Sequence, residues 1–174
     1  MATSGGKQAI FNAVVSLINP GDEVLIPKPY WVTFPEIVTF ARGRSVFIET
    51  EDNGFVLTAK MVRRAITDKT RLIILNSPSN PSGRVIPPAE FKEIMEVVAE
   101  HGLYAISDEC YLRFVYAPAT VFSAASLAPE LRRRLCIAGS LLKDLCDDRL
   151  AHWLFAGQRR LDARDAEGPG SFNE

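Results

Sequence analysis

Short apolar runs recur along this chain and alternate with segments whose apolar residues have helical spacing. This alternation limits the possible folds more than any other feature. Two stretches carry apolar residues at helical spacing, residues 7–17 and residues 88–101. The apolar runs predict strands at residues 24–26, 45–49, 71–75, 104–107 and 135–138. This alternation predicts a layered α/β domain with a mostly parallel sheet.

The composition narrows the class of protein further. A chain of 174 residues suits one domain, and a net charge of -1 excludes a strongly basic nucleic-acid binder. We expect no membrane partner, since no apolar stretch reaches the roughly 18 residues that a spanning helix needs. No signal peptide is visible, so a cytoplasmic protein is expected. Cys110, Cys136 and Cys146 are odd in number and lack metal-ligand spacing, which argues against disulfides and a metal site.

The segment Gly5-Gly6-Lys7 opens the first predicted helix and could bind an anion. Glycines let backbone N–H groups approach an anion, and the start of a helix carries partial positive charge. Taken alone, an ordinary glycine-rich helix start is the more common explanation.

Polar and aromatic residues also follow the predicted strands, at the edge of a parallel sheet where ligands bind. Asn80 lies in a Pro/Asn-rich segment, and Asp108 and Tyr111 come at the end of the next strand. A buried carboxylate needs a partner, which makes Asp108 a candidate binding residue. For Asn80 an ordinary turn, and for Trp31 a packed aromatic, are the more common explanations.

Lys143 follows the last predicted strand and Gly139-Ser140. A buried lysine beside a phosphate site can lose its proton and act as an imine-forming amine. A lone lysine is more often a solvated surface residue.

Together these segments are far more specific than any one of them. The order Gly-Gly-Lys, Pro-Tyr-Trp, Asn-Pro-Ser-Gly, Ser-Asp-Glu-x-Tyr and Gly-Ser-x-x-Lys over residues 2–143 resembles the class I/II aminotransferases, closest to the bacterial aspartate aminotransferases. The resemblance implies a three-layer α-β-α large domain of the fold type I class, a homodimer, and pyridoxal 5′-phosphate as cofactor. It also implies amino transfer between an amino acid, with aspartate favoured, and a 2-oxo acid.

The resemblance further implies a role for each motif. Lys143 would be the catalytic residue, forming the imine with the cofactor and then moving a proton. Asp108 would pair with the pyridine nitrogen, and Trp31 would stack on the ring. The remaining cofactor contacts would be phosphate ligands and donors to the phenolic oxygen: Gly5, Gly6, Lys7 and Ser140 for the phosphate, Asn80 and Tyr111 for the oxygen. Trp31 and Asn80 would also contact the substrate.

The chain departs from the family pattern around and after Lys143. Leu142 replaces the usual serine, and Ala151 stands where the family has a phosphate-binding arginine. The segment that precedes the family's glycine motif and the C-terminal small domain are not in this sequence. We therefore expect residues 1–143 to be a large-domain fragment, truncated at both ends.

Residues 144–174 lack Val, Ile, Met, Thr, Tyr and Lys, which predicts an irregular or poorly packed tail. Plausible codons for residues 145–157, read from the second base, translate as Y-A-M-T-G-W-R-I-G-F-S-P-G, a sequence close to the family's own. This suggests an out-of-frame tail, and the alternative is a divergent natural one. A well-packed strand there would argue against both the irregular tail and the frame slip.

Three functions remain open from the sequence. The chain could be a fragment that retains aminotransferase activity, a non-catalytic pyridoxal-phosphate-binding protein, or a non-functional remnant. Cofactor binding and amino-donor turnover separate them.

Overall fold

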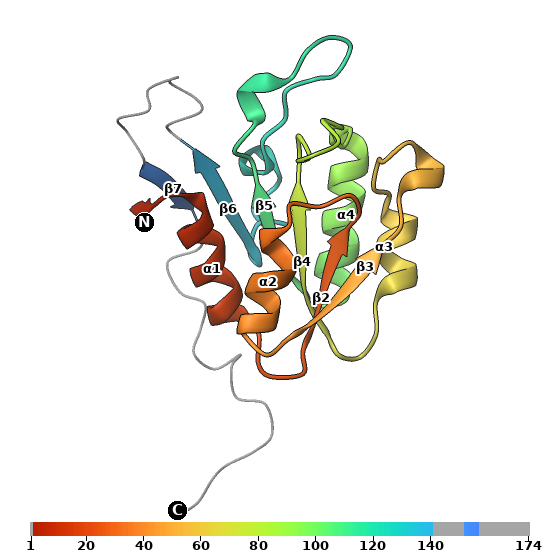
Figure 1. Cartoon of the computed structure of the whole chain (residues 1–174). Helices are drawn as coiled ribbons and strands as arrows, with labels where there is room; N and C mark the ends of the chain where they lie inside the picture. Colours follow the sequence, from red (N-terminus) through yellow and green to blue (C-terminus); the bar gives the residue numbers. More distant parts are fainter. Residues whose placement is uncertain (1, 141–151, 157–174) are drawn as a thin grey trace, which may run out of the picture.

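The computed structural model describes residues 2–140 and 152–156, and a seven-stranded sheet organises them (Figure 1). The strand order across the sheet is β1-β7-β6-β5-β4-β2-β3. Neighbouring strands from β6 across to β3 are parallel, and β7 runs antiparallel to both of its neighbours. The bounds are β1 (Ala2–Ser4), β2 (Glu23–Pro27), β3 (Arg44–Ile48), β4 (Thr70–Asn76), β5 (Tyr104–Asp108), β6 (Leu135–Ser140) and β7 (His152–Ala156). The mostly parallel sheet and its five predicted strands are confirmed.

Helices cover both faces of this sheet. α1 (Gly6–Leu17) and α2 (Thr33–Phe40) lie on one face, and α3 (Ala59–Ala65) and α4 (Pro88–Glu100) lie on the other (Figure 1). Three short 3-10 helices occupy connections: η1 (Glu51–Asn53), η2 (Leu112–Phe114) and η3 (Ala124–Ser126). The three-layer α-β-α arrangement is therefore confirmed.

Two apolar cores, one on each face, follow from the alternation of side chains along the buried strands. In β4, Ile73 and Leu75 pack with α3 and α4, whereas Leu72 and Ile74 pack with α1 and α2. All four side chains are at most 1% exposed. A strand covered on both faces has no polar side to present, which explains the continuous apolar run in the sequence.

The tail prediction was wrong over five residues. β7 (His152–Ala156) joins the central sheet between β6 and β1, in a region predicted to be irregular. Main-chain N–H and C=O groups make these pairings, so a segment without β-branched residues can still form them. The strand counts against an out-of-frame tail, and the rest of 144–174 lies outside the described residues.

The register of the central strands brings their carboxyl ends to one edge of the sheet. Asn76, at the end of β4, pairs with Asp108, at the end of β5. The connections after β4 and β5 continue from this edge (Figure 1). Within the described ranges, no helix is long and apolar enough to cross a membrane.

Candidate active site

A cavity of about 280 Å³ lies at the carboxyl ends of β4 and β5, beside the start of α1. Its volume is close to the lower end of the range for small-molecule pockets, about 300 Å³. The lining residues are Gly5, Gly6, Lys7, Ile10, Trp31, Asn76, Asn80, Asp108, Cys110 and Tyr111. The structure thus brings together the three N-terminal residues, the aromatic residue and the three polar residues predicted from separate motifs.

The start of α1 forms one part of the lining. Gly5 precedes the helix with a φ of 95°, a conformation that residues with a Cβ rarely adopt, and no side chain caps the helix there. The first turn of such a helix presents backbone N–H groups to a ligand, and the helix dipole favours an anion. The Nζ of Lys7 adds positive charge and lies 5.4 Å from the centre of the Trp31 ring. This part of the cavity is suited to a phosphate group.

Trp31 lies in the connection between β2 and α2. Its ring meets Phe34 edge-on, with a centroid separation of 5.5 Å and an interplanar angle of 89°. Phe34 is 2% exposed and belongs to the core under α1 and α2, so it fixes the indole against the body of the domain. Trp31 therefore offers an aromatic surface that is held in place from behind.

Asp108 ends β5 and is only 3% exposed. Its Oδ1 accepts a hydrogen bond of 3.2 Å from the backbone N–H of Cys110. This bond orients the carboxylate at the cavity wall. A buried carboxylate is stabilised by a cationic or N–H partner, and a protonated ring nitrogen would be such a partner.

Asn80 and Tyr111 form a hydrogen-bonded pair in the same wall. The Asn80 Nδ2 donates to the Tyr111 Oη over 3.3 Å. The backbone N–H of Asn80 donates to the Asn76 Oδ1 over 2.7 Å, which fixes the connection that carries it. Both side chains are part-buried donors that could bind a ligand oxygen.

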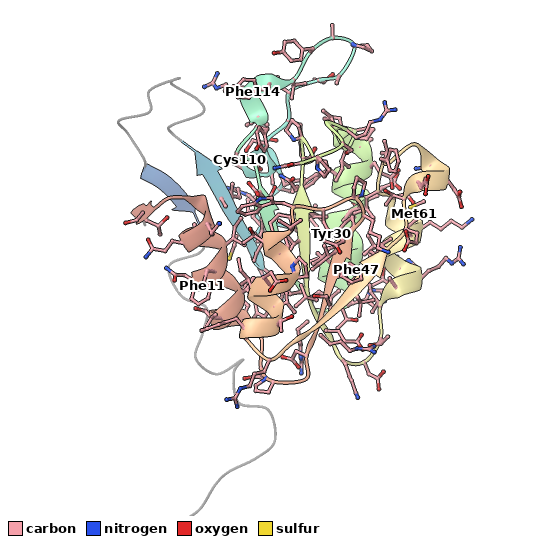
Figure 2. All side chains as sticks on the ribbon, viewed as in Figure 1. Phe11, Tyr30, Phe47, Met61, Cys110 and Phe114 are labelled. Carbon is pink, nitrogen blue, oxygen red and sulfur yellow. The ribbon has the colours of Figure 1, made fainter. Side chains whose placement is uncertain are left out.

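Three lining residues were missed by the sequence analysis. Ile10 lies one helical turn after Gly6, so the helical period could have identified it. Cys110 stands inside the motif between Asp108 and Tyr111, just beyond the end of β5 (Figure 2). Asn76 opens the Pro/Asn-rich segment, and only the pairing of β4 with β5 shows that it reaches the site.

Two predicted residues are not placed in the cavity by the structure. Ser140 is the last residue of β6 and pairs with Trp153 of β7. Lys143 lies outside the described residues. Their predicted roles, as phosphate ligand and catalytic lysine, therefore stay predictions. In the described part of the chain, no group of three or more His, Cys, Asp or Glu residues could hold a metal ion.

Comparisons of this sequence with known proteins find a matching family and similar relatives. The sequence profile of "Aminotransferase class I and II" matches residues 1–146. A probable aspartate/prephenate aminotransferase of Thermus aquaticus is 44% identical over 131 residues, which are 75% of this chain and 34% of that protein. The chain therefore spans about a third of the length of this curated relative.

Solved structures of aminotransferases also align with this chain. The aspartate aminotransferase of Thermus thermophilus with maleate aligns with a TM-score of 0.83 and 35% identity, over 90% of this chain and 40% of that one. The aromatic aminotransferase of Pyrococcus horikoshii OT3 aligns with a TM-score of 0.84 and 34% identity, over 90% and 42%.

Proposed function

The chain belongs to the class I and II aminotransferases, and from this premise we propose that residues 1–143 form the cofactor-binding part of a pyridoxal-phosphate-dependent transaminase. The observation that carries the proposal is the cavity at the carboxyl ends of β4 and β5. It gathers an anion-binding helix start, a fixed aromatic ring, a buried carboxylate and two oxygen-binding donors. Each of these matches one chemical group of pyridoxal 5′-phosphate.

The described residues fit that cofactor group by group. Gly5, Gly6 and Lys7 would hold the phosphate, and Trp31 would cover one face of the ring. Asp108 would hold the pyridine nitrogen in its protonated form. The phenolic oxygen would be bound by the two side chains that already form a hydrogen-bonded pair, Asn80 and Tyr111.

The chemistry would then be divided between cofactor and protein. When bound, pyridoxal 5′-phosphate supplies an electron sink for the bond broken at the substrate's α-carbon. Lys143 would remove and return the proton at that carbon as a general base and acid. Asp108, by keeping the ring nitrogen protonated, would maintain the electron demand of the ring.

The substrates are proposed from the resemblance and from the names of the relatives. Those names specify aspartate, prephenate and aromatic aminotransferases, and we favour aspartate as donor and a 2-oxo acid as acceptor. A homodimer and a cytoplasmic location complete the proposal.

Non-catalytic binding of pyridoxal phosphate is a second candidate, favoured by one observation. Ala151 occupies the position at which the family pattern has an arginine for the phosphate. Alanine cannot replace a bidentate guanidinium contact, so the phosphate interaction would rest on the start of α1 and on Ser140.

Titration of the full chain with pyridoxal 5′-phosphate tests both candidates. We expect a visible absorption band from the bound cofactor that is lost in Lys143→Ala and kept in Lys60→Ala, an exposed lysine on α3. Amino transfer from aspartate to a 2-oxo acid would support the transaminase, and binding without transfer would support the second candidate. A chain that does not bind the cofactor would contradict both.

The boundary of the fragment is also a proposal, which we place near residue 143. The family match ends at residue 146, close to the change in composition, as a frame slip would produce. The sheet strand β7 is what a divergent natural tail would show. Resequencing the gene across codon 143 decides: Y-A-M-T-G-W-R encoded in the same or the next reading frame establishes a slip, in the sequencing or in the gene, and its absence from both frames establishes the divergent tail.

A further inference from the structure

Asn76 lines the cavity at the end of β4, and its side chain connects two parts of the wall. Its Nδ2 donates a hydrogen bond of 3.1 Å to the backbone carbonyl of Asp108. Its Oδ1 accepts the bond of 2.7 Å from the backbone N–H of Asn80. A single half-buried amide thus joins the strand that carries the carboxylate to the connection that carries the oxygen-binding pair.

Each end of this link continues to a predicted ligand-binding group. Beyond Asn80, the chain of contacts runs to the Tyr111 hydroxyl. Beyond Asp108, it runs to the carboxylate, which the Cys110 N–H orients. The N–H of Ser77 donates to the same Asp108 carbonyl over 3.3 Å, so two donors from the end of β4 hold β5 in place.

We infer that Asn76 is a positioning residue, which sets the separation between the Asn80–Tyr111 pair and the Asp108 carboxylate and thereby the fit of the cofactor ring. This inference rests on the proposed function. Asparagine suits the task because it is a short side chain with one donating and one accepting end. Aspartate keeps only the acceptor, and alanine keeps neither.

The ligand-free protein provides the first test, by amide hydrogen exchange measured with NMR. In Asn76→Asp, the Asn80 N–H keeps its acceptor, whereas an oxygen now faces the Asp108 carbonyl. We therefore expect Cys110 N–H exchange to accelerate about tenfold while that of Asn80 changes little. In Asn76→Ala, both N–H groups should exchange faster.

Cofactor binding provides the second test. In both variants we expect the Kd for pyridoxal 5′-phosphate to rise about tenfold and the absorption maximum of the bound cofactor to shift. A residue that only stabilised the fold would not move the absorption maximum. The matched controls are Asn53→Asp and Asn53→Ala, since Asn53 also donates its Nδ2 to a backbone carbonyl, that of Val56, in a distant turn. These controls should leave both readouts unchanged.

The outcomes separate this inference from the function on which it rests. Unchanged Cys110 exchange in both Asn76 variants would overturn the positioning role. Faster exchange together with unchanged cofactor spectrum and affinity would overturn it as well. A wild-type chain that binds no cofactor would overturn the proposed function, and the exchange measurements would still decide whether Asn76 links the two parts of the wall.

Discussion

Asp108 shows how much one side chain can contribute to this site. The residue is 3% exposed, so its charge is poorly solvated by water, and a cationic group on a bound ligand would stabilise it. Asp108→Asn has the same shape and keeps an oxygen for the Cys110 N–H, but loses the charge. A charge-assisted hydrogen bond contributes about 1.5–3 kcal/mol, so we expect affinity for pyridoxal 5′-phosphate to fall about ten- to a hundredfold. Fluorescence titration measures this, with the exposed Asp68→Asn as control; equal affinities would refute the assignment.

A second buried carboxylate, Glu23, lies at the other end of the sheet and governs stability. It accepts hydrogen bonds from the Thr67 hydroxyl at 2.7 Å and from Arg44 at 2.5 Å. The Thr67 bond and the Arg44 guanidinium hold the pKa of Glu23 below its usual value of 4.5. A carboxylate with a lowered pKa stabilises the folded state above the unfolded-state value and loses that contribution as the pH falls.

Glu23→Gln should therefore lower the free energy of unfolding at pH 7 by about 1–2 kcal/mol, because it removes a charged acceptor from two donors. The difference from the wild type should shrink as the pH falls from 4.5 through the lowered pKa of Glu23. Urea unfolding across that pH range measures both effects. Glu130→Gln, at an exposed carboxylate, serves as the control. A difference that does not depend on pH would show that packing, and not charge, is lost.

At the scale of single residues, the sequence predicted which side chains line the site better than it predicted the hydrogen bonds that link them. Gly5, Trp31, Asp108 and Tyr111 were predicted because their types and order resemble a family pattern, and all four line one cavity. Asn76 was missed because its importance comes from hydrogen bonds to Asp108 and Asn80, which depend on strand pairing. Side-chain types can be read along a chain, whereas the contacts between strands form only in the fold.

Among the elements, the connection from β5 to β6 depends on one carboxylate. Glu109, 6% exposed, accepts hydrogen bonds from Ser107 at 3.1 Å, from Ser123 at 2.6 Å and from the N–H of Ala124 at 2.8 Å. The last two tie the start of η3 to the end of β5. Glu109 therefore anchors the segment that leaves the site after Tyr111.

Glu109→Ala would leave these three donors without their acceptor. We expect a loss of about 3 kcal/mol in the free energy of unfolding and faster trypsin cleavage at Arg113, within the released connection. Ser126→Ala is the control, since the Ser126 hydroxyl donates a local hydrogen bond to the backbone carbonyl of Ser123. That change should cost less than about 1 kcal/mol and leave the cleavage rate unchanged. Equal cleavage rates in both variants would disprove the anchoring role.

The elements that were predicted share a strong local signal, and the missed ones lack it. The strands β2, β4 and β5 are apolar because both of their faces are buried, and α4 combines a regular apolar period with proline at its start. α3 has seven residues and one fully buried side chain, Val62, so its period is too short to detect. β1 pairs with β7, and β7 pairs with β6, so both strands depend on pairings that no local pattern encodes.

The molecule as a whole should unfold cooperatively, and the rate at which the Cys136 thiol is chemically labelled can measure this unfolding. Burial raises the pKa of the Cys136 thiol to about 11, and the side chain is 5% exposed in the core under α1 and α2. The reactive thiolate is therefore scarce at pH 8. In a Cys110→Ser/Cys146→Ser variant, we expect thiol labelling at least about a hundredfold slower than in the unfolded chain. Its rate should rise with urea in parallel with global unfolding; a rate independent of urea would indicate local opening.

The edge pairing of β1 has a consequence for the order in which the protein can assemble during translation. β1 leaves the ribosome before the other described strands, yet its neighbour in the sheet is β7, so Ala2 must wait for Leu154. β4 has both of its partners, β2 and β5, once residue 108 has been made. The wall formed by Asn76 and Asp108 can therefore close on the nascent chain, whereas the glycine-rich start of α1, which directly follows β1, is fixed last. Ribosome-arrested chains that end before residue 152 should accordingly protect β4 from proteolysis and leave the segment around Gly5 open to cleavage.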